Sequence, residues 1–416
     1  MKRISMLLTL CISSLCLAES PLPVVSPESQ GYSSERFNRL DKAMQGYVDR
    51  REVGGCVCLV ARHGKVVYHK SFGYRDVEAE ARMSNDVIFG IMSMTKPIVS
   101  VALMQLWEDG KFQLDDPISK YLPEFAELQI ASLGEDGKLQ TAPAKNPIRV
   151  KHVLTHTSGL ASWYRGIGKA AYAKANANRR PDWTLGEFVS ELAKQPLNYE
   201  PGAYWEYGAA TDVVGRLVEV LSGEPLDEYL QKHLFAPLGM PDTYFYLPKE
   251  KLGRLAAAYR RGADGKISLL QAPNEHSRFF RGPQTYFSGQ GGLVSTTHDY
   301  FRFHQMMLGG GKIDDVRILG PMTVRLMTSN HIGDEAISIR GHGDGFGLGY
   351  SVVTAIGQSG LPNSIGTYSW GGAWGTVFFV DPEQDMLGVM MTQISPYSHL
   401  NIRRDFQTLT YSALLE

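Results

Sequence analysis

CVCLVARHGKVVYHKSFG, residues 56–73, is the stretch that most directly indicates the fold. Two runs rich in apolar and β-branched residues lie on either side of His63-Gly64, which has the composition of a tight turn, so the stretch predicts a β-hairpin. Cys56 and Cys58 are separated by one residue, and a disulfide at that spacing would be strained and would close almost no loop. We therefore expect both cysteines to be small buried hydrophobic residues.

The end of the chain repeats the strand pattern of its beginning. The runs GTVFFVD and MLGVMMTQI flank turn residues 381–385, which predicts a second pair of strands. A helix is predicted after them, because Ile402, Phe406 and Leu409 fall on one helical face.

The rest of the chain is predicted to be mainly helical. An amphipathic helix precedes the first hairpin and is capped near Ser33 or Ser34, and from about residue 97 helical patterns alternate with Gly/Pro loops. Strands at both ends with helices between them predict an α/β (α+β) fold, in which one antiparallel sheet is built from both chain ends and flanked by helices. No linker indicates two sequential domains. The predicted regions are a sheet region at about 28–96 and 285–416 and a helical region at about 97–284, within one domain of residues 19–416.

The first residues have the features of an export signal. Lys2 and Arg3 precede an apolar stretch at residues 4–17, and small residues follow, which predicts a signal peptide at residues 1–18. We expect a periplasmic protein without stable membrane insertion, because the apolar stretch is too short to span a bilayer. The alternatives are a buried N-terminal helix and a lipoprotein anchored through Cys16.

The charge balance argues against a polyanionic partner. Lys and Arg total 42 and Asp and Glu total 43 among 416 residues, and the sequence contains no basic cluster. Nucleic acid binding therefore has no electrostatic basis in the sequence, and a small-molecule ester or amide is the expected partner. The sequence does not indicate an oligomeric state.

Ser93 and Lys96 form the first candidate catalytic pair. Apolar residues at helical spacing follow them and stop at Asp109-Gly110, which places Ser93 at or near a helix N-terminus. Residues three apart share a helix face, so the Lys96 amine can reach the Ser93 hydroxyl and act as its base if burial lowers the lysine pKa. The alternative is that Ser93 only caps the helix, since Ser-x-x-Lys is common by chance.

Two further segments contain candidate site residues. Tyr207 comes just before a predicted helix that ends at Ser222-Gly223, where a tyrosine is usually part of the core. Gly371 and Gly372 precede a strand, and such glycines allow another backbone or a ligand to approach closely, or mark a bulge.

Five motifs in the same order resemble the serine β-lactamase and penicillin-binding protein superfamily, most closely the class C-like branch with the family VIII carboxylesterases. The resemblance extends from about residue 28 to the C-terminus, and its serine-x-x-lysine element is a known signature of the group. The motifs are FGIMSMTK (89–96), HVLTHTSGL (152–160), WEYGAATDVVGRLVE (205–219), SGQGGLVSTTHD (288–299) and WGGAWGT (370–376).

The resemblance implies a role for each matching residue. Ser93 matches the nucleophile, Lys96 its lysine partner, and Tyr207 the tyrosine that exchanges protons during acylation and deacylation. An oxyanion hole made by the N–H groups of Ser93 and Ala373 is implied as well. Whether Lys96 or Tyr207 is the acylation base is left open.

Two positions depart from the lactamase pattern. Ala209 stands where the second motif usually has asparagine, and Trp370 stands where the third motif usually has a cationic residue. Both changes remove polar contacts to a penicillin, so we expect a more apolar cleft than in a lactamase. Ala209, Trp370, Gly371 and Gly372 are the expected substrate-binding residues.

His152 and His156 have the spacing of a zinc motif, but the glutamate that should lie between them is missing. We expect structural roles for both, with no metal and no cofactor. The leading hypothesis is a carboxylesterase that acts on small or medium acyl esters. The alternatives are a β-lactamase or D-amino-acid peptidase, and a non-catalytic protein that binds cell-wall material.

Overall fold

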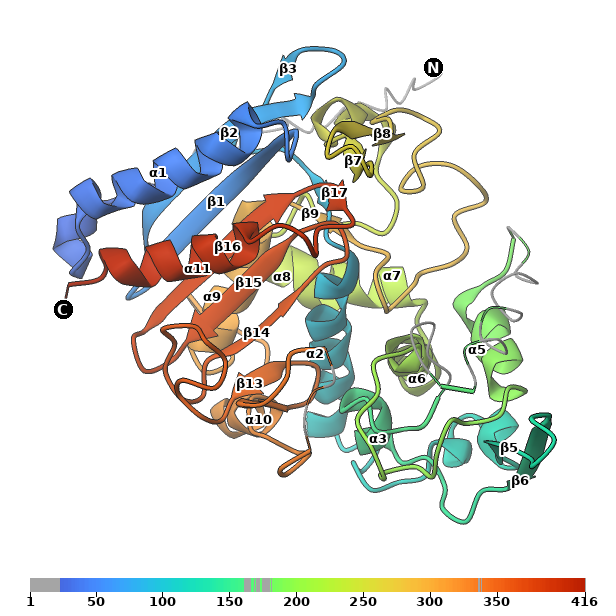
Figure 1. Cartoon of the computed structure of the whole chain (residues 1–416). Coiled ribbons are helices and arrows are strands. Elements are labelled where there is room, and N and C mark those ends of the chain that lie inside the picture. Colours follow the sequence, from blue (N-terminus) through green and yellow to red (C-terminus); the bar gives the residue numbers. More distant parts are fainter. Residues whose placement is uncertain are drawn as a thin grey trace, which may run out of the picture.

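An eight-stranded antiparallel sheet forms the centre of the computed structural model (Figure 1). The predicted signal peptide lies outside the described residues, and within the described part no helix is long and apolar enough to cross a membrane. The structure describes residues 23–160, 166, 167, 169, 173, 180, 182–335, 337 and 339–415. In sheet order the strands are β12 (Asp344–Phe346), β13 (Ser351–Val353), β14 (Tyr368–Gly371), β15 (Val377–Asp381), β16 (Met386–Thr392), β1 (Gly55–Arg62), β2 (Lys65–Asp76) and β3 (Ala81–Arg82).

The two ends of the chain meet in the middle of this sheet. Strand β1 pairs with β2 on one side and with β16 on the other, both antiparallel, and Cys56 lies opposite Thr392. His63 and Gly64 form the β1–β2 turn with φ angles of 51° and 71°, the left-handed conformation that a two-residue hairpin turn requires. The prediction of one antiparallel sheet built from both chain ends is confirmed.

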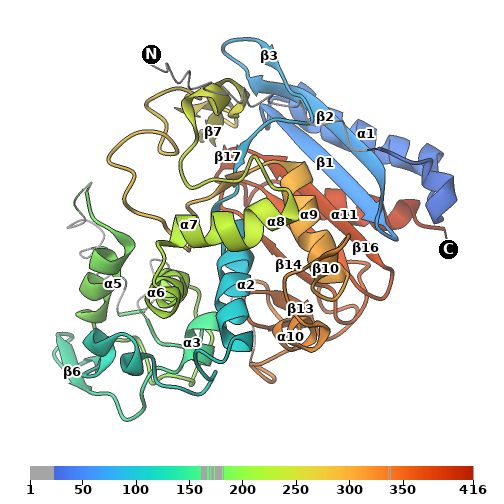
Figure 2. The ribbon, with the colours of Figure 1, turned by 180° about the vertical axis from the view of Figure 1, so that it is seen from behind.

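Helices cover both faces of the sheet. Helices α1 (Ser34–Asp49) and α11 (Ile402–Ala413) lie side by side on one face, and α2 (Thr95–Glu108) and α9 (Thr297–Leu308) lie on the other (Figures 1 and 2). The Ser33 side chain caps α1 by accepting a hydrogen bond from the N–H of Arg36, as the sequence predicts.

Alternation along β1 explains why both faces of the sheet are covered. Cys56 and Cys58 are buried free thiols that pack with α1 and α11, whereas Val57 and Leu59 point into the core around α2. Because both sets are buried, β1 is apolar throughout its length. The cysteines thus act as core residues, which confirms that prediction.

The inserted region is mainly helical, but it also contains hairpins that the sequence analysis did not predict. All their strands are short, and one strand of each hairpin, Leu139–Pro143 and Ile267–Gln271, is largely exposed, so it lacks the alternation that marks a half-buried strand. Gly137 and Gly265, with φ of 73° and 77°, supply their turns. The hairpins are β5 (Gln129–Leu133) with β6 (Leu139–Pro143) and β7 (Ala258–Arg261) with β8 (Ile267–Gln271), the latter extended by β17 (Ile394–Ser395).

Helix α2 passes through the centre of the molecule and joins the sheet to the helical region (Figure 2). Eleven of its fourteen residues are buried, because it packs against the sheet side and the inserted helices at once. The other α-helices and strands of the described residues are α3 (Val150–Leu154), α5 (Leu185–Ala193), α6 (Ala210–Ser222), α7 (Leu226–Leu230), α8 (Ala236–Leu238), α10 (Pro321–Met327), β4 (Phe89–Gly90), β9 (Val294–Ser295), β10 (Lys312–Ile313) and β11 (Val316–Arg317).

Candidate active site

Ser93 lies in a tight turn between β4 and α2. The turn is a single 3-10 turn, Met92–Met94, in which Met92 has a φ of 48°, unusual for a residue with a side chain. The hydroxyl of Tyr300 donates a hydrogen bond of 2.9 Å to the carbonyl oxygen of Met94. The backbone that presents the serine is therefore fixed by buried contacts.

Lys96 lies one residue into α2 and is buried. Its Nζ lies 3.3 Å from Ser93 Oγ, donates a hydrogen bond of 2.8 Å to the carbonyl oxygen of Gln290, and sits 4.6 Å from the centre of the Tyr207 ring. Burial lowers the pKa of Lys96 to about 7, and the negative charge of Asp212 opposes that shift. A substantial fraction of this amine is therefore neutral near neutral pH and able to accept a proton.

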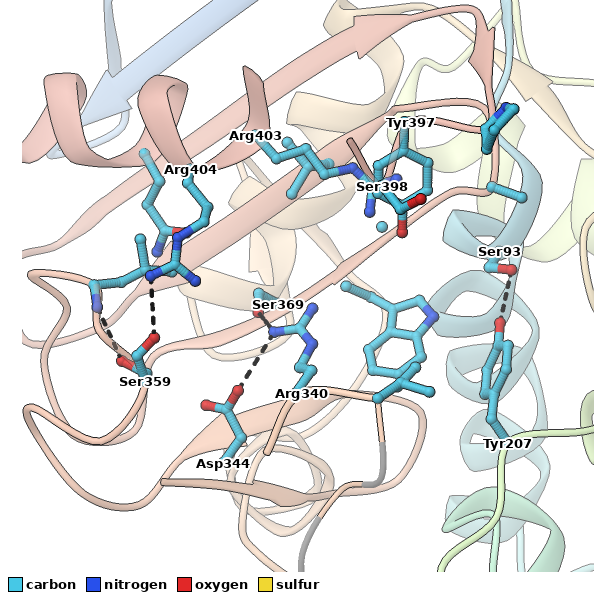
Figure 3. Close-up of a pocket in the computed structure, with 18 of the residues that line it drawn as sticks. Ser93, Tyr207, Arg340, Asp344, Ser359, Ser369, Tyr397, Ser398, Arg403 and Arg404 are labelled. Atoms are coloured by element: carbon cyan, nitrogen blue, oxygen red, sulfur yellow. Dashed lines mark hydrogen bonds and ion pairs between the residues drawn. The ribbon is translucent and has the colours of Figure 1, made fainter. Parts of the chain in front are cut away.

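Tyr207 lies just before α6, and its hydroxyl points at Ser93 (Figure 3). Its hydroxyl donates a hydrogen bond of 2.7 Å to Ser93 Oγ, across 114 residues of sequence. The ring packs against Trp370 and His156, with ring centres 5.4 Å and 5.0 Å away. Burial raises the pKa of Tyr207 to about 12, although hydrogen bonding with Ser93 and Trp370 opposes the shift, so the phenol remains protonated at neutral pH.

A buried carboxylate organises the segment that contacts Lys96. Asp212, in the first turn of α6, accepts hydrogen bonds from the Tyr286 hydroxyl at 2.8 Å, from the Ser288 hydroxyl at 3.1 Å, and from the Gln290 N–H at 3.1 Å and side-chain amide. All of these groups are donors, which suits an ionised carboxylate, although burial raises the pKa of Asp212. This network fixes the Gln290 carbonyl oxygen that faces Lys96.

The turn between β14 and β15 packs closely against the Ser93 turn. A Cβ atom on Gly372 would lie 2.3 Å from the carbonyl oxygen of Ile91 and 2.3 Å from Thr376 Oγ1, so only glycine fits there. The Thr376 hydroxyl also donates to the Ile91 carbonyl at 3.3 Å. This contact holds Ala373, a candidate oxyanion donor, next to the serine turn.

Two cavities meet at Ser93 and Ala373, which line both of them. One cavity, of about 580 Å³, extends from Tyr207 and Trp370 toward the N-terminal end of α11 (Figure 3). The other, of about 970 Å³, extends toward Phe245 and the loop before Gly291. A substrate can therefore place one part on each side of the serine.

The structure brings most of the predicted site residues together. Ser93, Tyr207, Trp370, Gly371 and Ala373 line the smaller cavity, and Lys96 lies beneath it. Ala209 and Gly372 do not line either cavity. Ala209 is fully buried at the start of α6, and Gly372 is in contact with the Ser93 turn instead.

The smaller cavity also contains charged residues that the sequence analysis did not identify. Arg340, Arg403 and Arg404 line it together with Asp344, beside apolar residues such as Trp370. The arginines come from a loop and from α11, and no sequence motif marks them. Asp212 and Gln290 were also missed as site residues, although both lie inside quoted motifs.

The two histidines have packing and capping contacts. His152 Nδ1 accepts a hydrogen bond from the N–H of Arg149 at the start of α3. His156 is buried against Tyr207, and burial lowers its pKa, so the ring is neutral. Within the described ranges, no three His, Cys, Asp or Glu side chains gather as a metal ion would require.

Comparison with known proteins places this geometry in a family. The profile described as Beta-lactamase matches residues 40–410, almost the whole chain. The chain belongs to the Beta-lactamase family. Its fold is that of the serine β-lactamase-like superfamily, and its relatives include esterases, as the sequence motifs predict.

Among similar proteins, Protein Rv1367c of Mycobacterium tuberculosis is 35% identical to this chain, over 83% of the chain and 86% of that protein. Esterase EstB of Burkholderia gladioli is 29% identical, over 85% of the chain and 89% of its own length. The solved structure of EstCE1, described as a hydrolase with promiscuous acyltransferase activity, superimposes with a TM-score of 0.78 at 29% identity. The superposition covers 90% of this chain and 98% of EstCE1. These relatives support a hydrolase that acts on esters.

Proposed function

We propose that this protein is a carboxylesterase that forms an acyl-enzyme on Ser93. The observation that carries the proposal is that Lys96 Nζ and the Tyr207 hydroxyl lie 3.3 Å and 2.7 Å from the same serine oxygen. A serine hydroxyl becomes a useful nucleophile only when a base in hydrogen-bonding reach takes its proton. Here both neighbours are within reach, and their pKa values differ widely.

The different pKa values of Lys96 and Tyr207 support different proton-transfer roles for the two residues. Neutral Lys96 accepts the Ser93 proton as Oγ attacks the ester carbonyl carbon, because its pKa of about 7 makes the free amine available. Tyr207, with a pKa of about 12, stays protonated and donates its hydrogen bond to Oγ before attack. The N–H groups of Ser93 and Ala373 stabilise the oxyanion of the tetrahedral intermediate.

Collapse of this intermediate gives the acyl-enzyme. The carbon–oxygen bond to the leaving alcohol breaks, and protonated Lys96 returns its proton to the leaving oxygen through the Tyr207 hydroxyl. A water then attacks the acyl carbonyl while the same pair takes its proton. The bond between the carbonyl carbon and Ser93 Oγ breaks, Oγ regains that proton, and the carboxylic acid product leaves. The two cavities that meet at Ser93 hold the acyl part and the leaving group.

Small or medium esters are the proposed substrates. Cavities of about 580 and 970 Å³ suit groups of that size, and EstB and EstCE1 are described as an esterase and a hydrolase. A β-lactamase or D-amino-acid peptidase is the second candidate, favoured by Arg403, a cation in the same cavity that such substrates would need for their carboxylate. Export through residues 1–18 to the periplasm is part of the proposal.

Steady-state assays with 4-nitrophenyl butyrate, a chromogenic cephalosporin and a D-alanyl-D-alanine peptide test these functions. We expect the ester to be the best substrate and Ser93→Ala to lower its kcat by about 10⁴-fold or more. Ser268→Ala, which changes an exposed serine on β8, is the matched control. Intact mass after treatment with a fluorophosphonate should show one adduct that Ser93→Ala abolishes.

Two results would overturn the proposal. Faster turnover of the cephalosporin or the peptide would favour the second candidate. No turnover of any substrate and no adduct would indicate a non-catalytic binding protein.

A further inference from the structure

The cavity beside Ser93 contains a half-buried positive charge that has no carboxylate partner among the described residues. Arg403, in the first turn of α11, donates a hydrogen bond of 3.2 Å from Nε to the Gly375 carbonyl and another to the Gly372 carbonyl, and its guanidinium stacks 3.5 Å from the Tyr397 ring centre. All of these partners are uncharged. Among the described residues no carboxylate forms an ion pair with Arg403, so its charge is not neutralised within the cavity wall.

A second guanidinium faces the same cavity from the opposite wall (Figure 3). Arg340 donates a hydrogen bond of 2.8 Å to the Ser369 hydroxyl and lies over Trp370, 5.0 Å from the ring centre. It also forms an ion pair with Asp344, whose carboxylate oxygen lies 3.8 Å from the guanidinium, longer than in a close charge-assisted hydrogen bond. Asp344 is the only acidic residue among the described residues that line this cavity, against three arginines.

The two guanidiniums repel each other across the cavity. Burial and, to a smaller extent, the positive charge of Arg340 lower the pKa of Arg403 to about 10. An anion bound between the two arginines would relieve this repulsion. Planar guanidiniums match a carboxylate with two parallel hydrogen bonds.

We propose that this cavity binds a carboxylate of the substrate between Arg340 and Arg403, so that the preferred esters carry an anionic group on their acyl or alcohol part. The inference rests on the proposed esterase function and adds a substrate class to it. The two cations come from α11 (Arg403) and from a loop (Arg340). Trp370 stands where a cationic residue is usual, and Arg340 lies over its ring. Arg404, at the cavity rim, is held by the Gly360 carbonyl and is not part of the proposed pair.

Matched charged and neutral esters test the proposal. The acyl arm compares 4-nitrophenyl hemiadipate with 4-nitrophenyl hexanoate, which have acyl chains of equal length. The alcohol arm compares 3-carboxyphenyl butyrate with 3-carbamoylphenyl butyrate. We expect a preference in kcat/KM of about tenfold or more for the charged ester in one arm, weakened by added salt because exposed parts of the interaction are screened.

Charge-removing variants identify the residues. Arg340→Gln and Arg403→Gln should each lower that preference about fivefold or more, whereas Arg39→Gln, an exposed arginine on α1, should leave it unchanged. The ratio of the two kcat/KM values is the readout, because Arg403→Gln also loosens the turn that holds Ala373 and lowers both rates. Equal rates on charged and neutral esters in both arms, or an undiminished preference in both variants, would overturn the proposal.

A binding experiment separates this inference from the proposed function. Calorimetry with adipate and with hexanoate does not need turnover, and adipate should bind more tightly to the wild-type protein and lose that advantage in Arg340→Gln. If neutral esters are hydrolysed through Ser93 and adipate binds no better than hexanoate, the anionic subsite is wrong and the esterase function stands. If adipate binds as expected and no ester is turned over, the esterase function is wrong and the anionic subsite stands.

Discussion

Lys96 Nζ donates a hydrogen bond of 2.8 Å to the carbonyl oxygen of Gln290, a residue 194 positions further along the chain. This bond uses one N–H of the amine and leaves its lone pair free to face Ser93 Oγ when the amine is neutral. The hydrogen bonds then run in one direction, from Tyr207 to Ser93, from Ser93 to Lys96, and from Lys96 to Gln290. The arrangement favours the lysine as the base of acylation.

The pH dependence of ester hydrolysis should report the ionisation of Lys96. We expect kcat/KM to fall as the pH drops through about 7, because the protonated amine cannot accept the Ser93 proton. The buried ring of His156 cannot account for this limb, since burial holds its pKa well below the ordinary value. A pH profile with a neutral ester checks this, and a flat profile from about pH 5.5 to 9 would exclude Lys96 as the base.

Lys96→Met should abolish activity and raise stability. Burial lowers the lysine pKa from 10.5 to about 7, so the unfolded chain binds a proton in a range where the folded protein does not. Above about pH 10.5 Lys96 is neutral in both states and does not lower the free energy of unfolding. As the pH falls from 10.5 to 7, the unfolded chain binds the proton and the free energy of unfolding decreases. Each pKa unit corresponds to about 1.4 kcal/mol, so the variant should gain up to several kcal/mol below pH 7 and nothing above pH 10.5.

Urea unfolding of wild type and Lys96→Met at several pH values measures this difference. Lys70→Met, an exposed lysine on β2 that pairs with Asp41, serves as the control and should show no gain. A Lys96→Met variant that is less stable than wild type at pH 6 would mean that the amine is well solvated in the folded protein.

The fold follows from the sequence where the pattern is strong. The strands at both ends are long and buried, so their apolar runs and the His63-Gly64 turn predict them and the antiparallel sheet. The hairpins at 129–143 and 258–271 were missed because exposed strands bury little and leave no pattern. The division of the domain at about residues 97 and 284 stays a prediction.

The site could be predicted only in part. Ser93 and Lys96 are on neighbouring turns, and Tyr207 belongs to a motif with a resemblance to a family, so local spacing and motif order lead to them. Arg340 and Arg403 carry no motif and are brought to one cavity only by tertiary packing. Trp370, at the place of a cationic residue, gives no sign that arginines from elsewhere in the chain line the same cavity.

Asp212→Asn should shift the pH profile and lower stability. The charge of Asp212 favours protonated Lys96, so its removal should move the acid limb to lower pH, by about half a unit to one unit. Asparagine also turns one oxygen acceptor into a donor among four donating groups, which should cost about 2–3 kcal/mol. A purely structural role predicts lower stability with an unmoved acid limb, so the two measurements together decide the role of Asp212.

Gly372→Ala should damage activity more than stability alone explains. The added Cβ would lie 2.3 Å from the Ile91 carbonyl oxygen, and backbone on both sides must separate to accommodate it. That movement draws Ala373 away from the Ser93 turn, so kcat should fall about 10²-fold or more while KM changes little, the pattern for loss of an oxyanion donor. Gly253→Ala is the matched control, because nothing lies within 4 Å of its added Cβ, and it should keep full activity. Wild-type kcat in a folded Gly372→Ala protein would mean that the Ala373 N–H does not contact the oxyanion.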